Sequence, residues 1–277
     1  MTPDANPPHP TSISSGPGVA TPLPSARPRE LRSVRQTGCC VVGAGPAGAM
    51  LALLLARQRV PVVLLEAHGG FDRDFRGDSL HPAIMRVMDE LGLAEELLEL
   101  PHRKVRHATL PANPPITVDL SRLPGRFPYI TLMPQARFLE FLTTHAGRYP
   151  SFELVMRANV RELVEQDGTV RGVRYRAPDG WHELHAALTV GADGRFSQIR
   201  RLCGLQPVVT AATIDVLWFR LPRLPGDPEG ASGGIGGGHA LLLVDRGEVW
   251  QLGMVIPKGS WPQLRAAGLA ALRRIVA

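Results

Sequence analysis

The clearest chemistry in this sequence lies in a glycine-rich turn at residues 43–48. The turn reads Gly43-Ala44-Gly45-Pro46-Ala47-Gly48, and it joins a short apolar strand predicted at Cys39–Val42 to an apolar helix predicted at Ala47–Arg57. In such a unit the first glycine permits the tight turn, the second lets the backbone approach a pyrophosphate, and the third lets helix and strand pack closely. The helix start also offers free N–H groups and partial positive charge to an anion. The spacing therefore predicts a dinucleotide-binding turn.

An acidic residue ends the next predicted strand. This strand covers Val62–Leu65, and Glu66 follows it, twenty-three residues after Gly43. A carboxylate at this position can accept hydrogen bonds from the ribose hydroxyls of an adenosine, and its charge disfavours a 2′-phosphate. The pattern predicts that the bound dinucleotide is FAD or NAD rather than NADP.

A second segment helps to decide between FAD and NAD as the bound dinucleotide. It reads Leu188-Thr189-Val190-Gly191-Ala192-Asp193-Gly194-Arg195. Taken alone, Asp193-Gly194 would be an ordinary turn after a strand. Together with the glycine-rich turn, the segment resembles the DG motif of the group A flavoprotein monooxygenases, the para-hydroxybenzoate hydroxylase-like family. The resemblance implies that Asp193 contacts the ribityl chain of FAD and that the same turn also touches the pyridine nucleotide.

Two further positions match the same family. Arg76 precedes a predicted helix, as does the family arginine near the flavin, and Gln135 opens a predicted helix, as does the family glutamine that contacts FAD. The resemblance further implies that the backbone of Val160 contacts the adenine. Without the resemblance, Arg76 would be interpreted as a solvated loop charge and Gln135 as a polar residue at a helix end.

One part of the family pattern is missing. The second flavin motif, a Gly-Asp segment followed by Ala-Ala-His, is absent, because the chain stops at Ala277 before that segment would arrive. The sequence therefore indicates a fragment of a longer protein or a shortened gene product. In either case we expect the flavin ring to lack one wall.

The family resemblance implies the reaction as well. NAD(P)H would reduce FAD in the flavin's own cleft, and the reduced flavin would use molecular oxygen to hydroxylate an aromatic or polycyclic small molecule. No side chain is identified as a catalytic acid or base. Three alternatives remain open: another flavin enzyme of the superfamily, such as a prenyl reductase or halogenase; a non-catalytic truncated remnant; and a plain NAD dehydrogenase.

Composition excludes several other classes of function. The 31 basic and 25 acidic residues give a net charge of +6, but they are scattered and the aromatic content is 5%, so no nucleic-acid surface is predicted. Twenty uncharged residues at 37–56 contain four glycines and a proline, which disfavours membrane insertion. The histidines lack metal-site spacing, so no metal is predicted. Three cysteines cannot form a disulfide framework and indicate a reducing, cytoplasmic compartment. The oligomeric state is not predicted.

The element pattern predicts an α/β fold. We expect a Rossmann-like FAD-binding domain, a glutathione-reductase-like variant with a β-meander, interleaved with a mixed-sheet substrate domain. The predicted units are a disordered Pro-rich arm at 1–36, an FAD-binding domain at 37–205 with an inserted segment at about 107–151, and a partial substrate domain at 206–277. In the FAD-binding domain, meander strands are predicted at 160–165, 170–176 and 181–185, a further strand at 187–190, two short strands within 106–120, and helices at 82–91 and 134–148. In the substrate domain, strands are predicted at 217–221, 240–245 and 248–256, a loop at 222–239 and a helix at 261–277.

Overall fold

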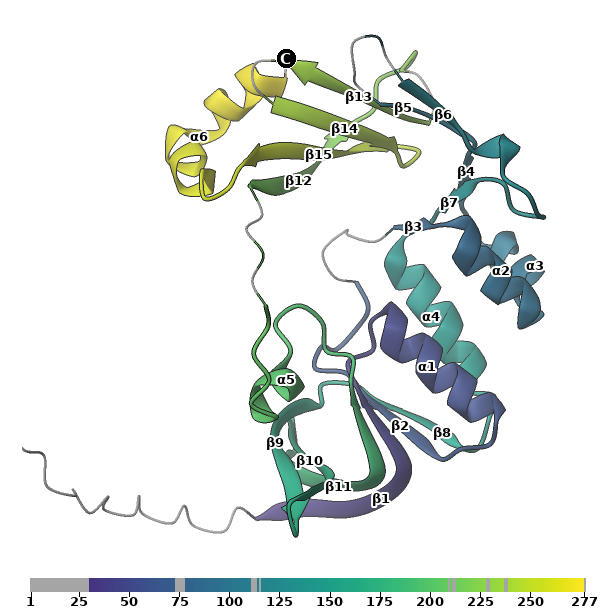
Figure 1. The fold of residues 1–277 in the computed structure, drawn as a ribbon, viewed down its shortest axis with the longest axis vertical. Coiled ribbons are helices and arrows are strands. Elements are labelled where there is room, and N and C mark those ends of the chain that lie inside the picture. The colour runs from purple at the N-terminus through teal and green to yellow at the C-terminus, as the bar shows by residue number, and fades with distance from the viewer. Residues whose placement is uncertain are drawn as a thin grey trace, which may run out of the picture.

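The computed structural model describes residues 30–72, 78–110, 114, 116–208, 210, 213–227, 230–236 and 239–276. Within these residues the chain forms two six-stranded sheets and one three-stranded sheet. Figure 1 shows the two larger sheets at opposite ends of the molecule, with a helical layer beside the first.

The first sheet combines parallel strands with a meander. Its strands are β1 (Leu31–Val42), β2 (Val62–Leu65), β8 (Phe152–Val155), β9 (Asn159–Gln166), β10 (Thr169–Ala177) and β11 (Gly180–Gly191), in the order β8-β2-β1-β11-β10-β9. β1 runs parallel to β2 and β11, β2 runs parallel to β8, and β9, β10 and β11 are antiparallel. This arrangement confirms the predicted Rossmann-like sheet with a β-meander.

Two of these strands are longer than the sequence predicted. β1 begins at Leu31, so residues 31–36 belong to the sheet and not to the predicted disordered arm, whose residues 1–29 lie outside the described residues. β11 is one continuous strand, although the sequence predicted a separate strand at 187–190. The two strands pair with each other along almost their whole length. This pairing satisfies the backbone N–H and C=O groups of segments that lack a strong apolar pattern.

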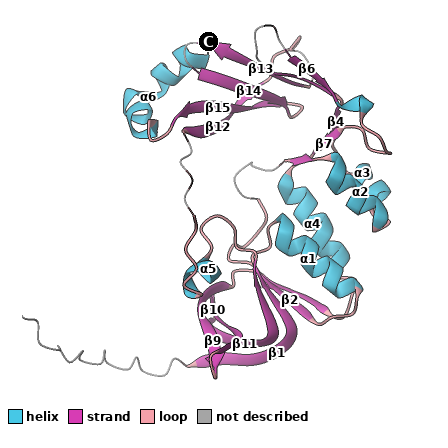
Figure 2. Cartoon of the chain, in the orientation of Figure 1, coloured by secondary structure: helices cyan, strands magenta, loops and turns pink. Residues whose placement is uncertain are grey.

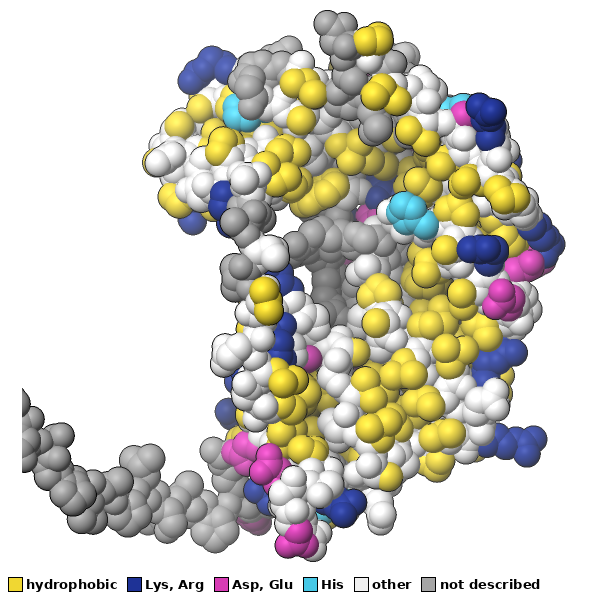
Figure 3. All heavy atoms as spheres, in the orientation of Figure 1, with side chains coloured by type: hydrophobic (Ala, Val, Ile, Leu, Met, Phe, Trp, Pro, Cys, Tyr) yellow, Lys and Arg dark blue, Asp and Glu magenta, His cyan; other side chains and the backbone are white. Residues whose placement is uncertain are grey.

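Both faces of the first sheet are covered. α1 (Pro46–Arg57) and α4 (Gln135–Ala146) lie on one face (Figure 2), where Val41 packs with Leu53 and Leu142. Val42, the next residue along β1, points to the opposite face and packs with Leu184. Figure 3 shows hydrophobic side chains gathered on the side of the molecule that carries these helices. The buried strands explain why the sequence around the glycine-rich turn carries so few charges.

The second sheet draws on two distant parts of the chain. Its strands are β5 (His107–Leu110), β6 (Ile116–Asp119), β12 (Ile214–Pro222), β13 (Ala231–Gly236), β14 (His239–Asp245) and β15 (Val249–Pro257), in the order β12-β15-β14-β13-β5-β6. β13 and β5 are parallel and the other pairs are antiparallel, so the sheet is mixed. The predicted insertion at about 107–151 is therefore divided, because β5 and β6 join the second sheet while α4 packs on the first.

β13 differs from the prediction of a loop at 222–239. Its sequence is rich in glycine, which weakens an isolated strand. Pairing with β14 along Ala231–Gly236 nevertheless supplies backbone hydrogen bonds that require no side chain.

The remaining elements connect or flank the two larger sheets. They are β3 (Ser79–Leu80), β4 (Arg103–Val105) and β7 (Ile130–Leu132) of the three-stranded sheet, the helices α2 (Pro82–Glu90), α3 (Ala94–Glu99), α5 (Gln198–Leu202) and α6 (Trp261–Val276), and a 3₁₀ turn at Leu120–Arg122. α6 is interrupted at Gly268, where φ is +78°. Among the described residues, no helix has the length and apolar character needed to span a membrane.

Candidate dinucleotide-binding site

The glycine-rich turn brings together the ends of β1 and β11 and the start of α1. Gly43 has a φ of +101°, and a Cβ atom there would lie 2.6 Å from the carbonyl oxygen of Ala192. A Cβ atom on Gly48 would lie 1.9 Å from the carbonyl oxygen of Gly43. Both positions therefore require glycine for backbone packing alone. Gly45 is different, because apart from its two chain neighbours no described residue has an atom within 4 Å of where its Cβ would be.

The open space beside Gly45 adjoins the start of α1. Gly45 is the N-cap residue, Pro46 occupies the start of the helix, and the first turn has neither a side-chain cap nor an acidic residue. The first N–H groups of a helix have no intrahelical partner, and the helix dipole favours an anion at this end. The predicted glycine-rich turn, from Gly43 through Ala44 and Ala47 to Gly48, is thus a backbone cradle that fits a pyrophosphate.

Glu66 lies directly against this turn. Its side chain is 2% exposed, and its Oε2 atom accepts a hydrogen bond from the main-chain N–H of Ala44 at 2.9 Å. Its Oε1 atom accepts a hydrogen bond from the main-chain N–H of His68 at 2.8 Å and lies 2.7 Å from Nδ1 of the same residue. These contacts fix the carboxylate beside the turn. Its contact with a ribose stays a prediction.

Asp193 organises the turn that follows β11. Its Oδ1 atom accepts a hydrogen bond from the Ser197 hydroxyl at 2.5 Å, and its Oδ2 atom accepts from the main-chain N–H groups of Gln198 at 2.5 Å and Ile199 at 3.1 Å. Ser197 in turn accepts a hydrogen bond from the main-chain N–H of Arg200 at 2.9 Å. The carboxylate therefore caps α5. A contact with the ribityl chain of a flavin stays a prediction for Asp193.

The other predicted positions have different surroundings. Arg76 lies outside the described residues. Gln135 is the first residue of α4 and lines a cavity described below. Val160 is buried in β9 at 4% exposure. Val160 lies two residues after Ala158, whose N–H donates to the carbonyl oxygen of Glu66 at 2.8 Å. The backbone at the start of β9 therefore passes close to Glu66.

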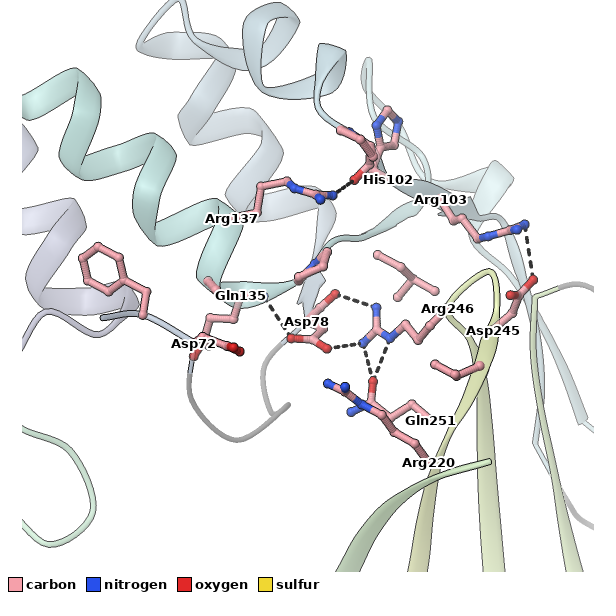
Figure 4. Close-up of a pocket in the computed structure, with 16 residues that line it drawn as sticks. Asp72, Asp78, His102, Arg103, Gln135, Arg137, Arg220, Asp245, Arg246 and Gln251 are labelled. Carbon is pink, nitrogen blue, oxygen red and sulfur yellow. Dashed lines mark hydrogen bonds and ion pairs between the residues drawn. The ribbon is translucent and has the colours of Figure 1, made fainter. Parts of the chain in front are cut away.

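A cavity of about 420 Å³ lies between the first-sheet part of the molecule and the second sheet (Figure 4). Its walls come from the loop after β2, the start of α4, the segment between α3 and β4, and strands β12, β14 and β15. The charged and amide side chains that line it are Asp72, Asp78, Arg103, Gln135, Arg137, Arg220, Asp245, Arg246 and Gln251.

Sequence reasoning identified Gln135 in this set and missed the charged residues around it. Asp245 is fully buried, accepts a hydrogen bond from Arg223 Nη1 at 3.0 Å and lies 3.3 Å from Arg103 Nη1. Burial lowers the pKa of the neighbouring Arg246 guanidinium, whereas the charge of the Asp78 carboxylate acts to raise it. The partners come from separate parts of the chain, so no local spacing pattern indicates them. The described residues contain no group of three or more His, Cys, Asp or Glu side chains suited to a metal ion.

A parallel sheet with a meander, a glycine cradle at the first helix and an acid at the end of the second strand define a dinucleotide-binding α/β protein. Residues 36–261 match the family described as FAD binding domain. The chain belongs to this family, which confirms the predicted FAD cofactor.

Two curated relatives are monooxygenases. The chain is 31% identical over 257 residues to 6-methylpretetramide 4-monooxygenase of Streptomyces rimosus, covering 90% of this chain and 60% of the relative. It is 27% identical over 172 residues to para-nitrophenol 4-monooxygenase of Pseudomonas sp. (strain WBC-3), covering 61% of this chain and 42% of the relative. The predicted resemblance to FAD-dependent monooxygenases is thereby confirmed, and the chain spans only part of each relative's length.

Solved structures share the fold. The chain superimposes on PqsL, a probable FAD-dependent monooxygenase from Pseudomonas aeruginosa, with a TM-score of 0.69 and 23% identity over 83% of this chain and 63% of that one. It superimposes on the myxobacterial chondrochloren halogenase CndH with a TM-score of 0.74 and 22% identity over 87% of this chain and 57% of that one. At this level of identity, the likeness extends to the fold and not to the reaction.

Proposed function

We propose that this protein is an FAD-dependent monooxygenase that uses NAD(P)H and molecular oxygen to hydroxylate an aromatic or polycyclic small molecule. The observation that carries the proposal is the 31% identity to 6-methylpretetramide 4-monooxygenase over 90% of the chain, which spans the glycine-rich turn, the acid and the DG motif. Bound FAD would supply the redox chemistry, and the protein would supply binding, orientation and exclusion of water.

Two regions of the chain would bind FAD: the glycine-rich turn with Glu66, and the DG motif at Asp193 together with the cavity edge at Gln135. The backbone cradle at Gly45 would bind the pyrophosphate, and Glu66 would bind the adenosine ribose. Asp193 would hold the turn at Asp193-Gly194, called the DG turn from here on, against the ribityl chain of FAD. Gln135 would contact the flavin at the edge of the cavity. The second sheet supplies the opposite wall of that cavity. The cavity is therefore the proposed site in which the substrate would lie beside the flavin ring.

The test begins with the purified chain and its visible absorbance spectrum. We expect a flavin spectrum, either as isolated or after addition of FAD. Oxidation of NAD(P)H and consumption of oxygen should rise with a phenolic or polycyclic aromatic substrate, and the product should carry one oxygen atom from isotopically labelled O₂. A protein that binds no FAD would contradict the cofactor role, and a flavoprotein that reduces a double bond without consuming oxygen would contradict the hydroxylase role.

A halogenase is the second candidate, because CndH shares the fold. The C-terminal strand offers little support for it. Of a halogenase-type Trp-x-Trp-x-Ile-Pro pattern, only Ile256-Pro257 is present, at the end of β15. Met254 and Ile256 are buried in that strand, which favours a packing role. Chloride-dependent formation of a chlorinated product would decide for the halogenase.

We further propose a cytoplasmic location. Cys39 and Cys40 are buried free thiols, and Cys203 is an exposed free thiol, an arrangement suited to a reducing compartment. Fractionation of the native cells should recover the protein with cytoplasmic markers.

A further inference from the structure

One ion pair joins the second sheet to the FAD-binding part of the molecule beside the cavity. Arg246 lies in the turn between β14 and β15. Its Nη2 atom lies 3.0 Å from Oδ2 of Asp78, and its Nη1 atom donates to the carbonyl oxygen of Asp78 at 3.2 Å. The two residues are 168 positions apart in the sequence. Figure 4 shows the guanidinium of Arg246 pointing toward Asp78 from the tip of the hairpin.

This contact is shielded from solvent and held in a defined geometry. The Arg246 side chain is 15% exposed and the Asp78 side chain is 9% exposed. Gln251, which is 4% exposed, accepts hydrogen bonds from Arg246 through Nε at 2.7 Å and Nη2 at 2.6 Å. The Gln251 side-chain amide therefore fixes the plane of the Arg246 guanidinium that contacts Asp78. Removing one partner from such a shielded pair leaves the other charge poorly compensated, so the pair is sensitive to substitution.

Asp78 also holds the start of α4. Its Oδ1 atom accepts a hydrogen bond from the main-chain N–H of Gln135 at 2.9 Å, and its carbonyl oxygen accepts one from the N–H of Met133 at 2.9 Å. One aspartate thus connects the β14–β15 hairpin to the segment that carries Gln135.

We propose that Arg246 is a positioning residue for the flavin-ring end of FAD, acting through Asp78 on the start of α4. The ion pair sets how the second sheet faces the segment that carries Gln135. The pyrophosphate cradle at Gly45 belongs to a different part of the fold and does not depend on this contact. The inference rests on the proposed function, since it requires Gln135 to lie at the flavin.

The test compares FAD with ADP, which lacks the flavin ring. Arg246→Met removes the charge and the donors, Arg246→Lys keeps the charge, and Arg265→Met, which changes an exposed arginine of α6, is the matched control. Dissociation constants are measured by fluorescence titration of FAD and by calorimetry with ADP. For Arg246→Met we expect about tenfold weaker FAD binding, unchanged ADP binding and a shifted visible spectrum of the bound flavin. Arg246→Lys should recover part of the FAD affinity, and Arg265→Met should behave as wild type.

Hydrogen exchange at the Gln135 amide gives a readout that needs no cofactor. Because this N–H donates to Asp78, Arg246→Met should speed its exchange, whereas the core amides of β1 should keep wild-type rates. Equal losses of FAD and ADP affinity, or no loss of either, would overturn the positioning role, as would unchanged exchange at Gln135. If the wild-type chain binds ADP but not FAD, the proposed function fails instead, and the exchange measurement still decides whether Arg246 orders the start of α4.

Discussion

The Oε2 atom of Glu66 accepts a hydrogen bond at 2.9 Å from the main-chain N–H of Ala44, the second residue of the glycine-rich turn. The carboxylate is buried, so this bond is shielded from water and ties the end of β2 to the end of β1. A residue predicted to bind the ribose therefore also shapes the turn predicted to bind the pyrophosphate. The two binding functions are expected to fail together when Glu66 is changed.

We expect Glu66→Gln to lower both stability and FAD affinity. The amide can still accept from Ala44, but its NH₂ group would face the N–H of His68, so one partly buried hydrogen bond is lost. This should cost about 1–3 kcal/mol in the free energy of unfolding, measured by urea denaturation. FAD titration should show weaker binding, because a neutral amide accepts less strongly from ribose hydroxyls. Glu90→Gln, at an exposed position of α2, is the control. Equal FAD affinity for Glu66→Gln and wild type would rule out the ribose contact.

Two glycines of the turn should respond differently to alanine. Gly48→Ala places a Cβ atom 1.9 Å from the Gly43 carbonyl oxygen, so we expect a loss of more than about 3 kcal/mol in unfolding free energy. In Gly45→Ala the methyl group meets no described atom within 4 Å beyond the two chain neighbours, so the protein should fold as wild type. It should bind FAD more weakly, because the methyl group occupies the cradle. Thermal melts and FAD titration of both variants provide the measurement. Undiminished FAD affinity in Gly45→Ala would contradict the cradle assignment.

The parts of the site that the sequence predicted depend on local spacing. The turn at Gly43–Gly48 and the acid at Glu66 follow from the requirement that a parallel strand–helix–strand unit place them at one edge of the sheet. Asp78 and Arg246 carry no comparable signal. Their contact depends on how the second sheet folds back over the cavity, which no local pattern encodes. The sequence could therefore predict the pyrophosphate end of the site and not the residues that frame the cavity.

The same distinction explains the fold. β2 was predicted at its observed bounds because four buried apolar residues lie between clear breaks. β13 was missed because its strand character comes from pairing with β14 and not from its glycine-rich side chains. The membership of β5 and β6 in the second sheet was also missed. Among the described residues, a single parallel pair, Ala231 with Ala108, joins them to it. Local rules predicted elements well where side chains determine them, and less well where backbone pairing does.

Asp193→Asn should loosen the DG turn. Both carboxylate oxygens accept hydrogen bonds at the start of α5, and an asparagine offers one acceptor oxygen in place of two. We expect a loss of about 1–2 kcal/mol, similar to that of a removed helix cap. Cleavage after Arg195 or Arg200 by trypsin should become faster in limited proteolysis. Asp167→Asn, in the turn between β9 and β10, is the control, because asparagine tolerates the positive φ of 49° found there. Unchanged proteolysis in Asp193→Asn would exclude a capping role.

His145 on α4 should make stability depend on pH. The residue is 4% exposed, and its Nε2 atom lies 3.0 Å from Oε1 of Glu96. Burial lowers the pKa of the His145 imidazole below its ordinary value, and the nearby Arg148 acts in the same direction, whereas the Glu96 carboxylate opposes them. The folded protein therefore binds this proton less readily than the unfolded chain does. The stability that results is present above the unfolded pKa of 6.5 and is lost as the pH falls through the lower folded value.

We therefore expect the wild-type chain to lose stability between about pH 7.5 and pH 5.5, a range that lies above the ordinary pKa values of carboxylates. His145→Gln removes the titrating imidazole from its buried place on α4 and should flatten this dependence, although the loss of its ring contact with Phe141 lowers stability at both pH values. His81→Gln, at an exposed position, should keep the wild-type slope. Urea denaturation of the three proteins at both pH values measures the difference. An equal slope in His145→Gln and wild type would show that another group carries the pH dependence.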